Sequence, residues 1–578
     1  MSGNRGTPSE VVGAPFPRGG QDTAARIKPP HEGRTRSARL RGYWLTPPGL
    51  AILAATALAL ILRLWMITRN GYFNGITEYD DGVYLGGSVR LLQGALPYHD
   101  FAFVQPPGIL LLMAPVALLT KATTTAAAMT VARILTVLAS TACIPLAGNL
   151  VRYRGVLVTV VTCGILAIYP DDVATAHTVL LEPWMNLLCL LAANAAFYRG
   201  RLARPGRLAW AGVALGFAAA VKFWAAVPAG VLLVLILLAR DQSGARPVRA
   251  RRTKFYLAGL AAGLIIPVAP FALTAPGAFV RSTLLDQATR AGSYVPVSLR
   301  LAHLTGLIDF LNRQGRFSLH AGIHSLFAGG GAATTGIASA GWLPFGFAAV
   351  LVVVIAVGYT WDPNRPSQLE WFALATAALA SLAILGYSAF FYHYPAFPGP
   401  WIALTAGGAV RSLGGRPEVR KAMIGCAAVL IVAVAALQMN EVADLGAPHA
   451  YADAAVIPQG ACVVTDEISM VISANRFTAA HPGCPDIIDS LATTLVLSNG
   501  VSVQGGAQNM SSVVAAWRAL LGKAQYVWLS SSNARRIPWT PGLKLWFADN
   551  FTRVLTTGPS AGDLYQRVTG PVPNPSGG

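Results

Sequence analysis

The chain has 578 residues, of which 54% are hydrophobic and only 12% are charged. This composition, with a mean hydropathy of +0.51, excludes an ordinary soluble domain and indicates an integral membrane protein with several spans. The formal net charge of +19 does not indicate a nucleic-acid partner, because many basic residues fall in the N-terminal tail and in short loops between apolar stretches. Such a distribution is typical of the positive-inside rule.

The N-terminal segment, residues 1–44, is rich in Arg, Pro, Gly and Ser and has no apolar periodicity. We expect it to be a disordered basic tail on the cytoplasmic side. The apolar run from Thr46 to Thr68 is too long and too far along the chain for a cleavable signal peptide, so we expect a retained anchor.

Apolar runs long enough to cross a membrane recur along the next part of the chain. We expect about eleven spans, near 46–68, 126–150, 155–170, 178–198, 208–222, 223–239, 255–275, 343–360, 371–391, 396–411 and 422–438. The run at 108–120 is too short to cross and is expected to be interfacial or re-entrant. The Arg-rich loops then lie on the side of the tail, which predicts a multi-pass plasma-membrane protein with a cytoplasmic N-terminus.

The composition changes after about residue 440, which divides the chain into a membrane domain at 45–440 and a second domain at 441–578. The segments "ACVVTDEISMVISANR" and "AQYVWLSSS" predict a strand followed by a helix, and a strand. We therefore expect an extracytoplasmic α/β domain at the C-terminus. Outside the cytoplasm, Cys462 and Cys484 either pair as a disulfide or remain two free thiols. The glycine-rich stretch 327–336 is either a lid or a plain linker.

Carboxylates gather just after the first span, where a bilayer surface makes their burial costly. The segment "DDGVYLGGSVRLLQGALPYHDFAFVQPPG" begins at Asp80. It resembles the first periplasmic loop of the GT-C superfamily of polyprenyl-phosphate-dependent glycosyltransferases, in the branch of the aminoarabinose transferases and protein O-mannosyltransferases, like glycosyltransferase family 39. The positions that match this signature in order are Asp80, Asp81, Tyr84, Gly94, Pro97, Tyr98, Asp100, Pro106 and Pro107.

This resemblance implies roles for the loop residues. Asp80 would be the base that takes the proton of the acceptor hydroxyl, and Asp81 would orient the acceptor or share a proton. Tyr84, Tyr98, Asp100 and Gln105 would contact substrate. Gln105 stands where the aminoarabinose branch has a lysine, which disfavours an aminoarabinose donor. The alternative is a solvated loop whose acids have no function.

Three further positions resemble functional segments of the same superfamily. Glu182 in "LLEPWMNLL" is similar to a second acidic position, with Asp171 and Asp172 as rivals nearby. Lys222 in "GFAAAVKFWAAVPAG" would bind a lipid phosphate as a point charge, and His393 in "FFYHYPAFPGPWIAL" belongs to a late aromatic-rich segment. The alternatives are a helix-end acid, a snorkelling lysine and an interfacial aromatic belt.

The sequence therefore predicts a mannosyltransferase-like, cell-wall-directed membrane glycosyltransferase. It would move a sugar from a polyprenyl-phosphate donor to a hydroxyl of a cell-envelope glycan, lipid or protein on the outer face. The alternatives are a transporter or flippase of lipid-linked sugars, and a scaffold that binds glycan. No cofactor motif is evident, and a divalent metal requirement is left open. The second domain is expected to bind the acceptor, with Trp528, Trp539 and Trp546 either stacking on sugar rings or packing in its core.

Overall fold

The computed structural model describes residues 44–239, 246–288, 290, 295–308, 342–361, 365–413, 416–443, 446–447, 453–477, 483–530, 536–556 and 562–568. The chain divides into two compact units, Met1–Leu45 and Thr46–Gly578, and the second unit is described here. The basic tail, apart from Trp44, and the glycine-rich stretch 327–336 lie outside the described residues. The expected boundary near residue 440 falls inside the second unit and stays a prediction.

The first part of this unit is built of helices. They are α2 (Pro47–Ile67), α3 (Tyr79–Leu92), α4 (Gly108–Ala117), α5 (Thr125–Val151), α6 (Val156–Ile168), α7 (Pro170–Ala174), α8 (Leu181–Ala196), α9 (Pro205–Val221), α10 (Ala226–Leu238), α11 (Arg246–Thr274), α12 (Pro276–Val280), α13 (Asp286–Ala288), α14 (Val297–Leu304), α18 (Leu343–Thr360), α19 (Gln368–Gly386), α20 (Gly399–Ala409) and α21 (Pro417–Glu441). A two-stranded ribbon, β1 (Phe197–Tyr198) and β2 (Arg201–Leu202), connects α8 to α9.

Six of these helices are long and apolar enough to cross a membrane, or seven if the bent pair α6 and α7 forms one span. Each of the eleven expected runs does contain a helix, but several of these helices are shorter than a bilayer requires. Helix α9 ends at Val221, where the backbone turns extended at Lys222, and α8 ends at the β1–β2 ribbon. The count of eleven crossings is therefore not established. The six or seven helices that are long and apolar enough do support a protein with several spans.

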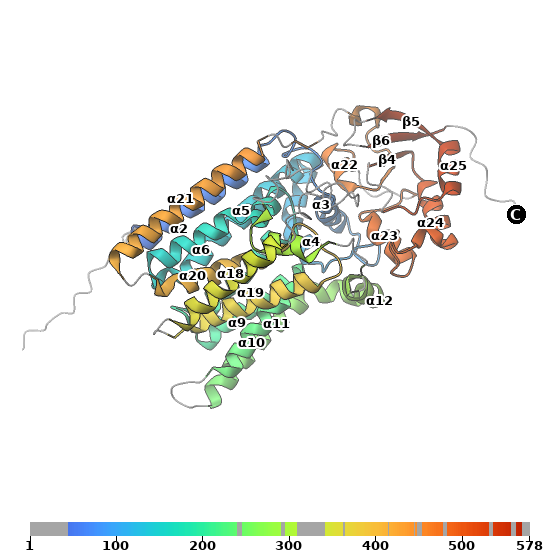
Figure 1. The fold of residues 1–578 in the computed structure, drawn as a ribbon. Coiled ribbons are helices and arrows are strands. Elements are labelled where there is room, and N and C mark those ends of the chain that lie inside the picture. The colour runs from blue at the N-terminus through green and yellow to red at the C-terminus, as the bar shows by residue number, and fades with distance from the viewer. Residues whose placement is uncertain are drawn as a thin grey trace, which may run out of the picture. The chain divides into compact units, whose positions relative to one another are not determined.

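Local sequence explains where the long helices begin and how they pack. Thr46 and Thr124 cap α2 and α5 by accepting a hydrogen bond from a backbone N–H of the first turn. Helices α9 and α11 lie side by side (Figure 1). At Gly212 a Cβ atom would lie 2.3 Å from the carbonyl oxygen of Tyr256, so glycine is required for this close approach.

The C-terminal part combines helices with a four-stranded sheet. Its elements are β3 (Val463–Thr465), α22 (Ile468–Ser473), α23 (Ser490–Leu497), α24 (Ser511–Leu521), β4 (Tyr526–Leu529), α25 (Pro541–Asn550), β5 (Phe551–Thr556) and β6 (Asp563–Arg567). The strand order is β3-β4-β6-β5, with β3 parallel to β4 and the other pairs antiparallel. Trp517 and Val527 lie in the hydrophobic core between the sheet and its helices. The strand and helix expected at 461–476 and the strand expected at 524–532 are present. We call residues 453–568 the outer domain, a name that follows the location predicted from the sequence.

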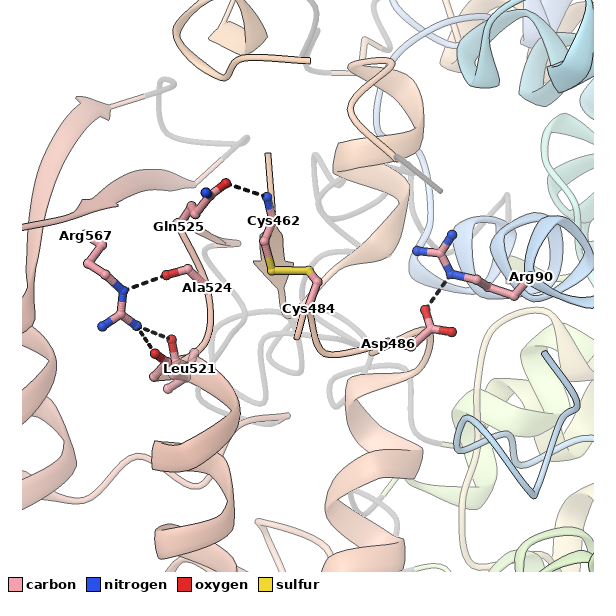
Figure 2. The surroundings of a disulfide bond; sticks show 9 residues. Arg90, Cys462, Cys484, Asp486, Leu521, Ala524, Gln525 and Arg567 are labelled. Carbon is pink, nitrogen blue, oxygen red and sulfur yellow. Dashed lines mark hydrogen bonds and ion pairs between the residues drawn. A yellow bond between two sulfur atoms is a disulfide. The ribbon is translucent and has the colours of Figure 1, made fainter. Parts of the chain in front are cut away.

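A disulfide links Cys462, at the start of β3, to Cys484 (Figure 2). Of the two alternatives that the sequence left open, the paired form is the one present. Two residues further on, Asp486 forms a 2.5 Å ion pair with Arg90 of α3 (Figure 2). The disulfide thus braces the segment that contacts α3.

Helix α3 packs directly against α22 of the outer domain (Figure 1). A Cβ atom at Gly82 would lie 2.3 Å from the backbone nitrogen of Ser469, so the two helices touch through their backbones. The Thr125 hydroxyl, at the start of α5, donates a 2.8 Å hydrogen bond to the carbonyl of Ile472. The loop motif after the first span is therefore held between the membrane helices and the outer domain.

Candidate functional site

The acid pair lies in the first turn of α3. Asp80 and Asp81 stand at the helix N-terminus, where the helix dipole favours negative charge, and Arg90 stands in the last turn. Neighbouring residues of a helix point about 100° apart. The two carboxylates consequently enter different surroundings.

Asp81 is completely buried in a network of protein donors. Its Oδ2 atom accepts a 2.6 Å bond from the Arg133 guanidinium and a 2.6 Å bond from the Thr178 hydroxyl. Arg133 also donates to the backbone carbonyls of Tyr72, Phe73 and Gly75. Both Asp81 and Arg133 have no exposed side-chain surface. The geometry gives Asp81 a structural role, because it fixes the loop before α3 to α5, and its expected role in orienting the acceptor or sharing a proton stays a prediction.

Asp80 keeps part of its surface exposed. Among the described residues its carboxylate accepts one hydrogen bond, 3.2 Å from the hydroxyl of Tyr84 one turn later. Tyr84 itself is buried and packs edge-on against Phe103. Of the two acids, Asp80 is therefore the one that a substrate can reach.

Three residues predicted from separate segments come together beside this turn. The ammonium group of Lys222, which follows α9, lies 2.5 Å from Oε1 of Glu182 in the first turn of α8. Nδ1 of His393 lies 3.0 Å from the same oxygen. Glu182 is fully buried, and its Oε2 atom has no hydrogen-bond partner among the described residues. We call Glu182, Lys222 and His393 the Glu182 cluster.

Aromatic rings surround the ammonium group of this cluster. It lies 4.2 Å from the ring centre of Trp224 and 4.3 Å from that of Tyr394, both cation–π contacts. Tyr84 donates a hydrogen bond to Asp80 and also lies within the electrostatic reach of Glu182. Burial raises the pKa of the Tyr84 hydroxyl well above its ordinary value, and the charges of Asp80 and Glu182 raise it further. The two acids thus both act on Tyr84.

Tyr98, Asp100 and Gln105 form a turn apart from this cluster. The Tyr98 hydroxyl donates to the backbone carbonyl of Gln105, and its ring packs against Phe103 and Phe279. Asp100 accepts a 2.7 Å bond from the backbone N–H of Leu96. Hydrogen bonding lowers the pKa of this exposed carboxyl. These contacts shape the chain, so the geometry does not support the expected substrate contacts of Tyr98 and Asp100.

The rival acids Asp171 and Asp172 are buried and lie within the electrostatic reach of the Glu182 cluster. Asp171 lies 2.8 Å from Nδ1 of His303, and both side chains are buried. Asp172 is buried as well, with its Oδ2 atom against the backbone of Gly399. Glu182 is the acid of these three that forms an ion pair with Lys222.

The sequence reasoning missed other polar groups around Asp80. Tyr392 donates a 2.5 Å hydrogen bond to Oε1 of Glu78. Asp489 of the outer domain accepts a 2.6 Å bond from Tyr79. The guanidinium of Arg290 lies 4.8 Å over the ring of Phe391. Glu78 stands two residues before Asp80, and Tyr392 adjoins His393, which was the available signal, whereas nothing local marks Arg290 or Asp489.

Within the described ranges, no group of three or more His, Cys, Asp or Glu side chains is arranged to hold a metal ion. The outer-domain tryptophans also differ from one another. Trp528 is fully buried, which removes it from any sugar-binding surface, whereas Trp539 and Trp546 are partly buried against the same core.

Comparison with known proteins gives matches among solved structures only. No protein-family model and no curated protein matches the chain. ArnT from Cupriavidus metallidurans bound to undecaprenyl phosphate is similar over 90% of this chain and 98% of its own, with 15% identity and a TM-score of 0.55. The apo state of the same protein is similar over 91% of this chain and 98% of its own, with 14% identity and a TM-score of 0.52. The apo oligosaccharyltransferase of Archaeoglobus fulgidus gives 14% identity, 85% and 70% coverage and a TM-score of 0.50.

These similarities establish the fold. ArnT, an aminoarabinose transferase, and the oligosaccharyltransferase are both members of the GT-C superfamily. The chain shares the fold of these structures, which confirms the resemblance predicted from the segment after the first apolar run.

Proposed function

We propose that the protein is a membrane glycosyltransferase that moves a sugar from a polyprenyl-phosphate donor to a hydroxyl of a cell-envelope glycan, lipid or protein on the outer face. The observation that carries this proposal is the juxtaposition of a partly exposed carboxylate, Asp80, with the buried Glu182 cluster around Tyr84. A base beside a cationic group is the arrangement that transfer from a phosphate leaving group requires.

In the proposed reaction, Asp80 accepts the proton of the acceptor hydroxyl as the acceptor oxygen attacks the anomeric carbon. The bond between that carbon and the phosphate oxygen breaks, and polyprenyl phosphate leaves with the electron pair. Attack from the face opposite the phosphate inverts the anomeric carbon. Tyr84, which donates to Asp80, holds the carboxylate in place.

Two cationic groups, Lys222 and Arg290, would hold the donor phosphate. Lys222 directs one N–H at Glu182, and its remaining N–H groups lie among the rings of Trp224 and Tyr394. Arg290 adds a second positive charge that acts on Asp489. A guanidinium and an ammonium group together suit a phosphate monoanion or dianion.

A lipid-linked donor is favoured by the surroundings of the site. The acid-bearing helix α3 follows directly on α2, an apolar helix long enough to span the membrane, so the sugar phosphate of a donor would lie at the bilayer surface with its tail in the lipid. One similar structure is described as bound to undecaprenyl phosphate, a carrier of this class. The outer domain would grip the acceptor, and it would lie outside the cytoplasm, where its disulfide is stable.

The test is donor consumption by purified protein in nanodiscs, supplied with polyprenyl-phosphate sugars and a cell-envelope extract. Release of polyprenyl phosphate and labelling of the acceptor are expected with wild type, and a loss of roughly a hundredfold or more with Asp80→Asn. Asp100→Asn, which removes an exposed carboxylate of the same loop, is the matched control. A transporter or flippase would move the lipid without consuming it, and that result would overturn the proposal.

A further inference from the structure

Glu78 occupies an unusual place at the start of α3. It is the N-cap residue, yet its side chain makes no hydrogen bond to the helix. The preferred N-cap residues, such as Asp, accept a bond from the second or third backbone N–H, and glutamate is not among them. The Glu78 carboxyl instead accepts the 2.5 Å bond from Tyr392. The Glu78 side chain therefore binds Tyr392 and does not cap α3.

The partner of Glu78 belongs to the other half of the site. Tyr392 is buried, immediately precedes His393 of the Glu182 cluster, and packs edge-on against the imidazole ring of His393. Glu78 itself stands two residues before Asp80 and, like Asp80, is partly exposed. The hydrogen bond between Glu78 and Tyr392 thus joins the turn that holds Asp80 to the segment that holds His393.

The charged groups that face Glu78 are predominantly carboxylates. Asp80 and Asp81 lie on its own helix, Glu467 comes from the outer domain, and the Tyr72 hydroxyl faces it from the preceding loop. Burial, reinforced by these three carboxylates and opposed by the Tyr392 hydrogen bond, raises the pKa of Glu78 to about 8. A carboxyl with this pKa is mostly protonated at neutral pH and can donate a hydrogen bond.

We propose that Glu78 is a substrate-contacting residue that donates a hydrogen bond to an oxygen of the sugar held at Asp80, with Tyr392 fixing its orientation. This inference rests on the proposed function. It assigns different roles to two carboxyl groups of one turn: Asp80 is the base and Glu78 is a hydrogen-bond donor. Neighbouring acids can take such different roles when their environments separate their pKa values. The ligand class is a neutral, hydroxyl-bearing sugar, since an oxygen acceptor is what a carboxylic acid recognises.

The proposal predicts how transfer depends on pH. Wild-type kcat/KM should fall as pH rises through about 8, because ionised Glu78 loses its donor and adds charge beside Asp80. Glu78→Gln keeps an N–H donor at every pH, so it should retain transfer at pH 7 within a few-fold and lose the alkaline limb. Glu78→Ala should lose roughly tenfold or more at pH 7, because the sugar oxygen is left without its donor.

A second variant and a control separate this role from simple packing. Tyr392→Phe removes the bond that lowers the pKa of Glu78, so the alkaline limb should move to higher pH. Glu418→Gln, which alters an exposed glutamate of α21, should leave the profile unchanged. Comparing kcat/KM on a sugar with each hydroxyl replaced by hydrogen identifies the contacted oxygen, because only there do wild type and Glu78→Ala become equal.

Three results would overturn the inference while leaving the proposed function intact. They are wild-type turnover with an alkaline limb that Glu78→Gln preserves, a folded Glu78→Gln that is inactive at every pH, and a Glu78→Ala as active as wild type. If wild type consumes no polyprenyl-phosphate sugar, the proposed function fails, and the role assigned to Glu78 in that reaction fails with it.

Discussion

The hydroxyl of Tyr79, the residue directly before Asp80, donates a 2.6 Å hydrogen bond to Asp489 of the outer domain. The same Asp489 oxygen accepts a 2.8 Å bond from the backbone N–H of Ala492 and so caps α23. The guanidinium of Arg536 lies 4.0 Å over the Tyr79 ring. The start of the acid-bearing helix is therefore fastened to the outer domain by one side chain.

Tyr79→Phe should lower kcat more than it raises the donor KM. The substitution keeps the ring under Arg536 but leaves the buried Asp489 without one of its donors, at about 1–3 kcal/mol, and loosens the turn that carries Asp80. Steady-state kinetics with the polyprenyl-phosphate donor measure the effect, and Tyr198→Phe at an exposed tyrosine is the control. Unchanged kcat in a folded Tyr79→Phe protein would show that the outer domain does not position Asp80.

Asp80→Asn and Asp81→Asn should fail in different ways. Asp80 is partly exposed, so its amide variant should keep wild-type thermal stability and lose transfer. Asp81→Asn leaves the buried Arg133 without a charged partner, which typically costs about 3–5 kcal/mol. Thermal unfolding in detergent, run beside the transfer assay, distinguishes them. Equal stability of the two variants would contradict the structural role assigned to Asp81.

Variants of the ion pair between Lys222 and Glu182 can distinguish an effect on protein stability from an effect on donor binding. Lys222→Met alone strands a buried carboxylate and should destabilise the protein by about 3–5 kcal/mol. Adding Glu182→Gln should restore much of that stability, because no charge is left unpaired. Donor binding should stay weak in the double variant if Lys222 contacts the phosphate. Recovery of both stability and donor affinity would give Lys222 a purely structural role.

The disulfide should support the docking of the outer domain on α3. Replacing Cys462 and Cys484 by serine together should destabilise the protein by about 3 kcal/mol, since the bridge closes a loop with a sequence separation of 22 residues. The loop includes the segment before Asp486, so the ion pair with Arg90 should weaken as well. Limited proteolysis at 483–490 and thermal unfolding report the change. Cys426→Ser, at a free cysteine, is the control.

Some features of this protein were determined by sequence alone. Long apolar runs require helices in a membrane, and the order of acids, tyrosine and prolines after the first run indicated the superfamily fold. The positions of β3 and α22 also followed from local sequence, because each element is formed by a few consecutive residues.

The tertiary structure decided which of the marked residues meet. Asp80 and Asp81 are adjacent in sequence, yet helix rotation and the position of Arg133 bury one carboxylate and leave the other accessible. The Glu182 cluster joins residues from three distant segments, and no local pattern encodes which of them face one another. The role of Glu78 depends in the same way on Tyr392. The protonation of a carboxyl group depends on its burial and on all the charges near it, and only folding brings those neighbours together.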